Sequence, residues 1–247
     1  MRIVVCVKHV PDMQSERRFE GGRLVRGEDD VLNELDENAI EAAVQLKETE
    51  EDVGREAEVV ALTMGPEDAE DALMRALQMG ADRAYLVSDE FLEGSDVITT
   101  ASVLSVAIAK IADECGPVDL VITGMASLDA MTSMLPGALA AKAHMPLLGL
   151  ARSMSVEDGT VTIERSVDGF TETLRAALPA VVSVTDQINE PRYPAFAAMK
   201  AARKKPLDQW GIDDLVEVPG GQDLVLRRAP TSVTFSEENV RDGSGTI

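Results

Sequence analysis

A glycine-led loop rich in hydroxyl groups is the part of this sequence best suited to bind a ligand. It reads GMASLDAMTS over residues 124–133 and follows the apolar run LVIT, which is typical of a buried strand. The backbone amides of such a loop, with the hydroxyls of Ser127, Thr132 and Ser133, have the chemistry to hold a phosphate. An ordinary strand-to-helix turn would show the same residues, so this pattern alone leaves both interpretations open.

Stronger nucleotide fingerprints and catalytic motifs do not occur in the sequence. It contains neither a GxxxxGK[ST] nor a GxGxxG pattern, and no serine stands in a GxSxG elbow. His9 and His144 lie far apart without acidic residues at metal-ligand spacing, and Cys6 and Cys115 form no CxxC pair. The sequence therefore predicts no catalytic residue and no metal site.

Charged residues near the expected strand and helix ends are open to simpler interpretations. Lys8 follows the first apolar run, where it could neutralise a phosphate or simply cover a strand end. Two acidic sets at the ends of an expected helix are predicted to be solvated surface. They are Glu34, Asp36 and Glu37, and Glu48, Glu50, Glu51 and Asp52.

A second candidate site is a turn-rich segment followed by basic residues. Residues 178–184 (LPAVVSV) read as a strand and 189–194 (NEPRYP) as a loop, and the basic segment 199–205 (MKAARKK) follows on a chain of formal charge −21. A loop held out from a rigid sheet in this way is typical of a docking site for another protein. The acidity, which solubility or a salty cytoplasm would explain, argues against a nucleic-acid or anionic-membrane surface.

Alternating strands and helices must position these residues. Apolar runs predict strands at 3–7, 57–64, 83–87 and 118–123, and helical patterns occupy 33–51, 67–79, 96–114 and about 132–143. This order indicates βαβ units, and hence an α/β fold with a doubly wound, mainly parallel sheet. Such sheets bind ligands at the carboxyl ends of the strands, where Lys8, Met64–Pro66 and the glycine-led loop would meet.

Beyond residue 146 the pattern changes. Residues 153–165 alternate around Asp158-Gly159 and predict a β-hairpin, and 170–184 are expected to return towards the sheet. We divide the chain into an α/β nucleotide-binding domain, 1–205, and an extended C-terminal arm, 206–247. The domain includes the hairpin excursion at 150–165 and a recognition loop at 189–200. The arm has too few apolar residues for its own core, so we expect it to pack on a partner subunit.

No apolar stretch approaches the roughly 20 residues that a membrane span needs. The N-terminus, MRIVVCVKHV, reads directly as a strand rather than as a signal peptide. These observations predict a cytoplasmic protein without membrane insertion, in which both cysteines are reduced.

Five motifs in this order resemble the β subunits of the electron transfer flavoproteins. They are VCVKHVPD (5–12), NELDENAIEAAVQLKE (33–48), TMGPEDAEDALMRALQMGADRAYLV (63–87), DLVITGMASLDAMTS (119–133) and ERSVDGFTETLRAALPAVVSVTDQINEPRYPAFAAMKAARKK (164–205). The resemblance covers roughly residues 1–215. It implies an adenine-nucleotide-hydrolase-like fold and a heterodimer whose α subunit carries most of the FAD site.

The family's function is electron transport rather than bond chemistry by this subunit. The dimer takes electrons from acyl-CoA and related dehydrogenases, as in fatty acid oxidation, and passes them to a quinone oxidoreductase. In the β chain the resemblance implies a structural AMP. The positions that match its site are Cys6, Asn33, Glu34, Leu35, Asp36, Met64, Gly124, Met125, Ala126, Ser127, Leu128, Asp129, Thr132, Ser133, Met134 and Leu135. Many relatives carry an acid-rich or GDT-type segment where this chain has DAMTSML, so the match is most direct at Gly124, Asp129, Thr132 and Ser133.

The family's docking loop, which inserts an apolar anchor into the dehydrogenase, matches NEPRYPAFAAMK (189–200). Phe196 stands where relatives usually have leucine and is the expected anchor, with Tyr193, Met199 and Lys200 beside it. Met13 matches a position that approaches the flavin edge in relatives.

Two other functions are compatible with parts of the sequence. Some relatives bifurcate electrons and hold a second FAD in place of AMP, although the NEPRY and MKAARKK segments favour the simple carrier. A stand-alone protein that senses or hydrolyses an adenine nucleotide would need a catalytic base or a metal site, and would leave the loop and arm unexplained.

Overall fold

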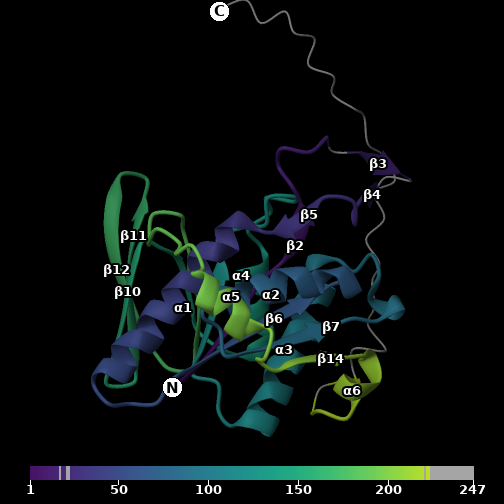
Figure 1. Ribbon diagram of the computed structural model, residues 1–247. Coiled ribbons are helices and arrows are strands. Elements are labelled where there is room, and N and C mark those ends of the chain that lie inside the picture. Colours follow the sequence, from purple (N-terminus) through teal and green to yellow (C-terminus); the bar gives the residue numbers. More distant parts are fainter. Residues whose placement is uncertain (17, 21–22, 220, 223–247) are drawn as a thin grey trace, which may run out of the picture.

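A seven-stranded sheet forms the centre of the computed structural model, which describes residues 1–16, 18–20, 23–219 and 221–222 (Figure 1). The strand order is β14-β7-β6-β1-β8-β13-β9, and every neighbouring pair is parallel. This confirms the predicted α/β fold. The strands are β1 (Arg2–Cys6), β6 (Glu58–Met64), β7 (Arg83–Val87), β8 (Leu120–Gly124), β9 (Leu147–Ala151), β13 (Ala180–Val184) and β14 (Leu207–Trp210).

Helices cover both faces of this sheet. On one face α1 (Glu34–Asp52) and α2 (Glu70–Met79) pack over a core that includes Ile3 and Val5, and α5 (Phe196–Ala202) lies against α2. On the other face α3 (Val97–Cys115) and α4 (Leu135–Ala143) cover Val4, and α6 (Ile212–Val216) lies against α3. Strands buried on both faces explain the continuous apolar runs in the sequence. Two short 3₁₀ helices, η1 (Glu67–Ala69) and η2 (Glu90–Leu92), precede α2 and α3.

The order of the strands creates a switch point between β1 and β8. From β1 the chain moves outward through α1 to β6 and through α2 to β7, and α3 then brings it back to β8 on the other side of β1. Doubly wound sheets bind ligands in the crevice beyond the carboxyl ends of the strands at such a point. The segments that leave β1 and β8 therefore flank the place where a ligand is expected.

The excursion after β9 is larger than predicted. The hairpin of β10 (Ser153–Glu157) and β11 (Thr160–Val167) is confirmed, but β12 (Phe170–Ala177) adds a third antiparallel strand (Figure 1). The segment 170–184, which we expected to return towards the sheet, does so in two parts: β12 pairs with β11, and β13 joins the central sheet. Alternating residues mark a strand but do not reveal which sheet it joins.

Two edge strands, β9 and β14, were not predicted. Each is short, and β14 pairs with β7 just after the predicted domain boundary at residue 205. Its last residue, Trp210, stacks on Tyr85 with ring centroids 4.2 Å apart, so this part of the predicted arm belongs to the body of the chain. Residues 223–247 lie outside the described residues, and packing of the arm on a partner stays a prediction.

Two small sheets shape the excursion after β1. Strand β2 (His9–Pro11) pairs with β5 (Asp30–Leu32), and β3 (Phe19–Glu20) pairs with β4 (Arg23–Leu24). The β2–β5 ladder returns the chain to Asn33, whose backbone N–H donates to the Lys8 carbonyl over 2.9 Å. The start of α1 is thereby placed beside the end of β1.

Candidate functional site

Asn33 joins the start of α1 to the loop that follows β8. Its amide nitrogen donates to the Ala126 carbonyl and its oxygen accepts from the Leu128 N–H, each over 3.0 Å. The residue is fully buried. It occupies the predicted N-cap position, but its side chain makes no capping hydrogen bond to α1. The side chain instead holds the shape of the predicted phosphate loop.

Asp36 lies buried between α1 and the same loop. Its Oδ2 accepts from the Lys8 N–H over 2.9 Å, and a Cβ on Gly124 would lie 2.5 Å from Oδ1 and 2.7 Å from the Leu35 carbonyl oxygen. Burial raises the pKa of Asp36 to about 7, although backbone hydrogen bonds from Lys8 and Gly124 lower it. The absence of a side chain at Gly124 thus permits the close approach of α1 to β8.

The prediction that the acidic sets of α1 are solvated surface is wrong at two positions. Asp36 is 6% exposed because the first turn of α1 packs on the loop. Glu50 is equally buried and accepts two hydrogen bonds from Arg55, over 2.6 and 2.7 Å. The partner of Asp36 is distant in sequence, and the partner of Glu50 lies outside the helix. The pattern of charges along the helix does not reveal either partner.

Lys8 and Arg26 converge on Asp129 across the switch point. The Lys8 Nζ lies 2.8 and 3.1 Å from the two carboxylate oxygens, and Arg26 also pairs with Asp129. The Asp129 side chain is 2% exposed, whereas those of Lys8 and Arg26 are 40% and 35% exposed. Burial alone would raise the pKa of Asp129, but the two cations outweigh it and lower the pKa to about 2. Sequence reasoning missed Arg26, which comes from the polar excursion and has no motif around it.

The outer part of the loop presents hydroxyl groups to solvent. Helix α4 begins at Leu135 rather than at the predicted Thr132, and Ser133 has a left-handed backbone with φ of 51°. Thr132 and Ser133 are exposed, and no hydrogen bond within the described part of the chain engages their hydroxyls. These donors, with Lys8 and Arg26 at the rim, fit an anionic group such as a phosphate.

The other predicted nucleotide residues surround this edge. Burial and the nearby Asp36 raise the pKa of the Cys6 thiol to about 12, so the thiol is protonated at neutral pH. Glu34 and Met134 are exposed, and Leu35, Met125, Ser127 and Leu128 are half-buried. Ala126 is buried, and Met64 and Leu135 pack, partly buried, against the core beneath α3.

Among the described residues, neither a metal site nor a cavity is a better candidate than this edge. No group of three or more potential His, Cys, Asp or Glu ligands occurs among the described residues. A cavity of about 720 Å³ lies at the opposite edge, by the amino ends of β1 and β6. Arg2, on its wall, pairs with Glu58 over 2.8 Å, and we assign the cavity no ligand.

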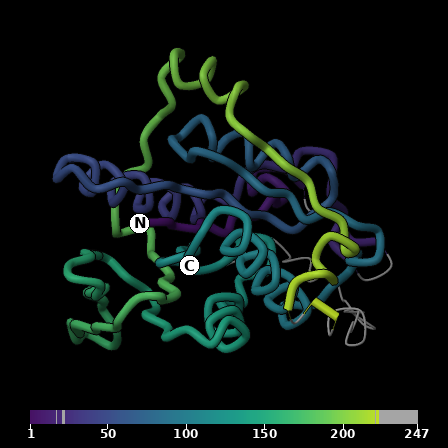
Figure 2. Tube along the Cα trace, turned by 90° about the horizontal axis from the view of Figure 1, so that it is seen from below, coloured from purple at the N-terminus to yellow at the C-terminus, as the bar shows by residue number. Residues whose placement is uncertain are grey.

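The predicted docking loop leaves the sheet after β13 and forms an arch above α1 and α2 (Figure 2). Tyr193 and Phe196 are 85% and 81% exposed. Lys200 is also exposed, and Met199 is half-buried. The arch thus presents two aromatic rings and a cation to an incoming surface. Met13, for which the sequence suggested a flavin contact, is 54% exposed.

None of the helices within the described ranges is both long enough and apolar enough to cross a bilayer. This agrees with the absence of long apolar stretches from the sequence.

Comparison with known proteins identifies the family. The electron transfer flavoprotein domain model matches residues 22–215. The chain is 39% identical to the electron transfer flavoprotein subunit beta of Mycobacterium tuberculosis, over 97% of this chain and 92% of the relative. It is equally similar to that of Mycobacterium leprae, and 32% identical to the caffeyl-CoA reductase-Etf complex subunit CarD of Acetobacterium woodii over 100% and 91% of the two chains. The chain therefore belongs to the electron transfer flavoprotein family, among its β subunits.

Proposed function

We propose that this chain is the β subunit of a heterodimeric, cytoplasmic electron carrier that binds one structural AMP. It helps to enclose a FAD that the α subunit mainly holds, and it catalyses no bond chemistry by itself. It docks acyl-CoA-type dehydrogenases through residues 189–200, and the dimer passes their electrons to a quinone oxidoreductase.

The observation that carries the AMP assignment is the loop at the switch point. Asn33 holds its inner part, while Thr132 and Ser133 present at its rim hydroxyls that no residue of the described part of the chain engages. Lys8 and Arg26 both pair with Asp129 while remaining partly exposed, so two cations face one carboxylate here. A single phosphate needs several neutral donors with cations nearby, and this edge supplies both.

Mass spectrometry of the small molecules released from the co-purified heterodimer tests this assignment. We expect one AMP and one FAD per heterodimer. Two FAD molecules and no AMP would instead establish the alternative function, an electron-bifurcating subunit that holds a second FAD in this site. Release of FAD alone, at one per heterodimer, would contradict nucleotide binding by this chain.

Two substitutions in the loop localise the AMP. Thr132→Val removes one hydroxyl at constant shape, and Ser133→Gly removes the other while tolerating the left-handed backbone. The double variant should lose AMP and keep FAD. The matched control is Thr171→Val with Thr173→Val, two exposed threonines on β12, which should leave both nucleotides in place.

Docking by the arch is tested with Phe196→Ala. Apolar anchors at protein interfaces typically contribute enough that their loss lowers kcat/KM about 10- to 100-fold. The assay is reduction of the heterodimer by a substrate-reduced acyl-CoA dehydrogenase, with the flavin spectrum as the check on integrity. Phe170→Ala is the control, because Phe170 is 72% exposed and belongs to β12 rather than to the arch. Equal rates for wild type and Phe196→Ala would contradict the docking role.

A further inference from the structure

A row of polar side chains on α1, the polar stripe, forms hydrogen bonds with the first residues of the arch. Asn38, Glu41, Gln45 and Glu48 are spaced by three, four and three residues, which places them on one face of the helix. The Asn38 amide donates to both the carbonyl and the side-chain oxygen of Asn189 over 3.1 Å, and Asn189 donates back to the Asn38 carbonyl over 3.0 Å. The chain thus enters the arch in a defined position.

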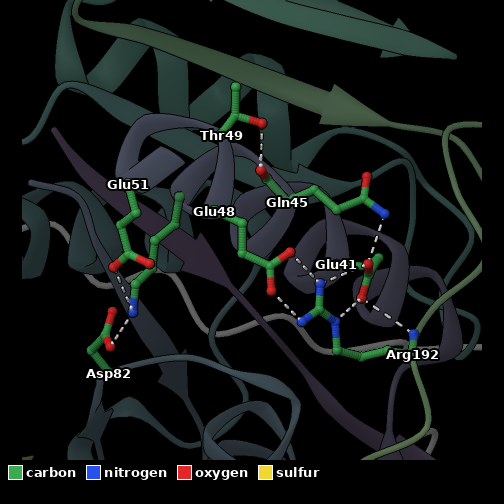
Figure 3. A network of polar contacts seen from close by, with 8 residues as sticks. Glu41, Gln45, Glu48, Thr49, Glu51, Asp82 and Arg192 are labelled. Atoms are coloured by element: carbon green, nitrogen blue, oxygen red, sulfur yellow. Dashed lines mark hydrogen bonds and ion pairs between the residues drawn. The ribbon is translucent and has the colours of Figure 1, made fainter. Parts of the chain in front are cut away.

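Arg192 forms the strongest part of this connection (Figure 3). Its guanidinium donates to Glu41 over 2.7 and 3.1 Å and to Glu48 over 2.6 and 2.9 Å. Its backbone N–H also donates to Glu41, over 3.2 Å. The side-chain amide of Gln45 donates to the same carboxylate over 2.7 Å. The Glu41 side chain is 4% exposed, so Arg192 neutralises a buried charge as well as joining the arch to α1.

The exit of the arch is held by α2. The Lys205 ammonium donates to the carbonyls of Leu77 and Ala81, at the end of α2, over 3.0 and 2.5 Å. The Arg75 guanidinium lies 5.6 Å from the centre of the Tyr193 ring and bonds Glu37 over 3.1 Å. The exposed rings of Tyr193 and Phe196 therefore lie between two anchored ends.

We propose that Arg192 is a positioning residue that orders the arch before docking, so that a dehydrogenase meets a preformed surface. This inference rests on the proposed docking function. A loop that is already ordered loses less conformational entropy on binding, and the partner then binds with higher affinity. Because Arg192 faces α1 and not the tip of the arch, its effect on docking would pass through Tyr193 and Phe196.

The test compares Arg192→Gln with a matched control, Arg55→Gln, in the intact heterodimer. Arg55 also makes a two-pronged pair with a buried glutamate of α1, Glu50, but it does not contact the arch. Arg192→Lys keeps the charge without the planar fork and should restore part of the effect. The first measurement is hydrogen exchange of the amides at 193–202, and the second is KM and kcat for a substrate-reduced acyl-CoA dehydrogenase.

We expect Arg192→Gln to speed exchange in the arch and to raise KM about tenfold, with kcat at saturating dehydrogenase within about twofold of wild type. Arg55→Gln should change neither the exchange of the arch nor KM. Phe196→Ala should raise KM without altering exchange, because it removes the contact and not the order. If Arg192→Gln folds poorly, Glu48→Gln removes only the more exposed half of the connection and should raise KM about threefold.

Wild-type exchange and KM in Arg192→Gln would overturn the proposal. A KM defect in Phe196→Ala but not in Arg192→Gln would overturn the positioning role and leave the docking function intact. Unchanged KM in Phe196→Ala would overturn the docking function itself, and the inference for Arg192 with it.

Discussion

Two loops leave neighbouring strands at the same edge of the sheet and are built in opposite ways. The loop at 124–135 follows β8 and keeps its charged group inside, with the Asp129 side chain 2% exposed. The arch at 189–200 follows β13, keeps its ion pairs at its base on α1, and turns Tyr193 and Phe196 outward at 85% and 81% exposure. We therefore expect substitutions in the first loop to lower the free energy of unfolding, whereas substitutions at the tip of the second loop should change it little.

The largest effect that would test this comparison is expected for Gly124→Ala. The added Cβ would lie 2.7 Å from the backbone oxygen of Leu35, which cannot move without shifting α1. We expect a loss of ~3 kcal/mol in the free energy of unfolding, measured with urea. Gly137→Ala in α4 is the control, because its Cβ would make only an ordinary 3.9 Å contact and should stabilise slightly.

Asn33→Ala and Asn38→Ala compare the attachments of the two loops directly. Asn33→Ala leaves the Leu128 N–H and the Ala126 carbonyl without this partner in a fully buried place and should cost ~2 kcal/mol, with loss of AMP. Asn38→Ala loosens only the arch and should cost ~1 kcal/mol, with AMP retained. Urea unfolding and nucleotide content are the measurements. Equal loss of AMP in both variants would contradict the separation of the two sites.

Two buried carboxylates at the first loop, Asp36 of α1 and Asp129 of the loop itself, should have pKa values shifted in opposite directions. The pKa of Asp36 is raised to about 7, so its contribution to stability is complete below its unfolded pKa near 4 and is lost as the pH rises to about 7. The pKa of Asp129 is lowered to about 2, so its contribution is present above pH 4 and is lost as the pH falls to about 2. Each contribution is of the order of a few kcal/mol.

Carbon-13 NMR of the aspartate carboxyl groups measures these midpoints, with Asp36→Asn and Asp129→Asn to assign the signals. A midpoint near 4 for Asp36 would show that the loop does not bury it. The α1 carboxylates that hold the base of the arch, Glu41 and Glu48, differ from Asp36 because the hydrogen bonds from Arg192 lower their pKa values.

The smallest effect on stability is expected at the tip of the arch. Phe196→Ala should change the free energy of unfolding by less than ~0.5 kcal/mol, because an exposed side chain contributes little to packing. Urea unfolding, measured beside the docking assay, should show that the variant loses docking while its free energy of unfolding is unchanged. A loss above ~1 kcal/mol would mean that the ring packs on the body of the protein.

Much of the fold follows from patterns that are local in sequence. The runs at 3–7, 57–64, 83–87 and 118–123 correspond within about two residues to β1, β6, β7 and β8, because strands buried on both faces must be apolar throughout. The edge strands β9 and β14 escaped prediction because they are short and one of them, LDQW, is half polar. The pairing of β12 with β11 was not predicted, because no local pattern indicates the partner of a strand.

The candidate sites divide in the same way. Residue types and their order along the chain marked two candidates, the hydroxyl-bearing loop at 124–133 and the aromatic, basic segment at 189–205. They did not reveal that Arg26 would reach Asp129 or that Asp36 would be buried, because both facts depend on residues about 90 to 100 positions away along the chain. Neither the polar stripe on α1 nor its partner Arg192 was predicted from the sequence.

The sequence by itself determined the alternation of strands and helices, the family, and which two loops carry exposed functional groups, since each depends on residue type and short spacing. Only the tertiary structure decided which charges are neutralised, which carboxylates are buried and how the arch is held. Those properties depend on solvent exclusion and on distances between segments brought together by the sheet, and no local pattern encodes them.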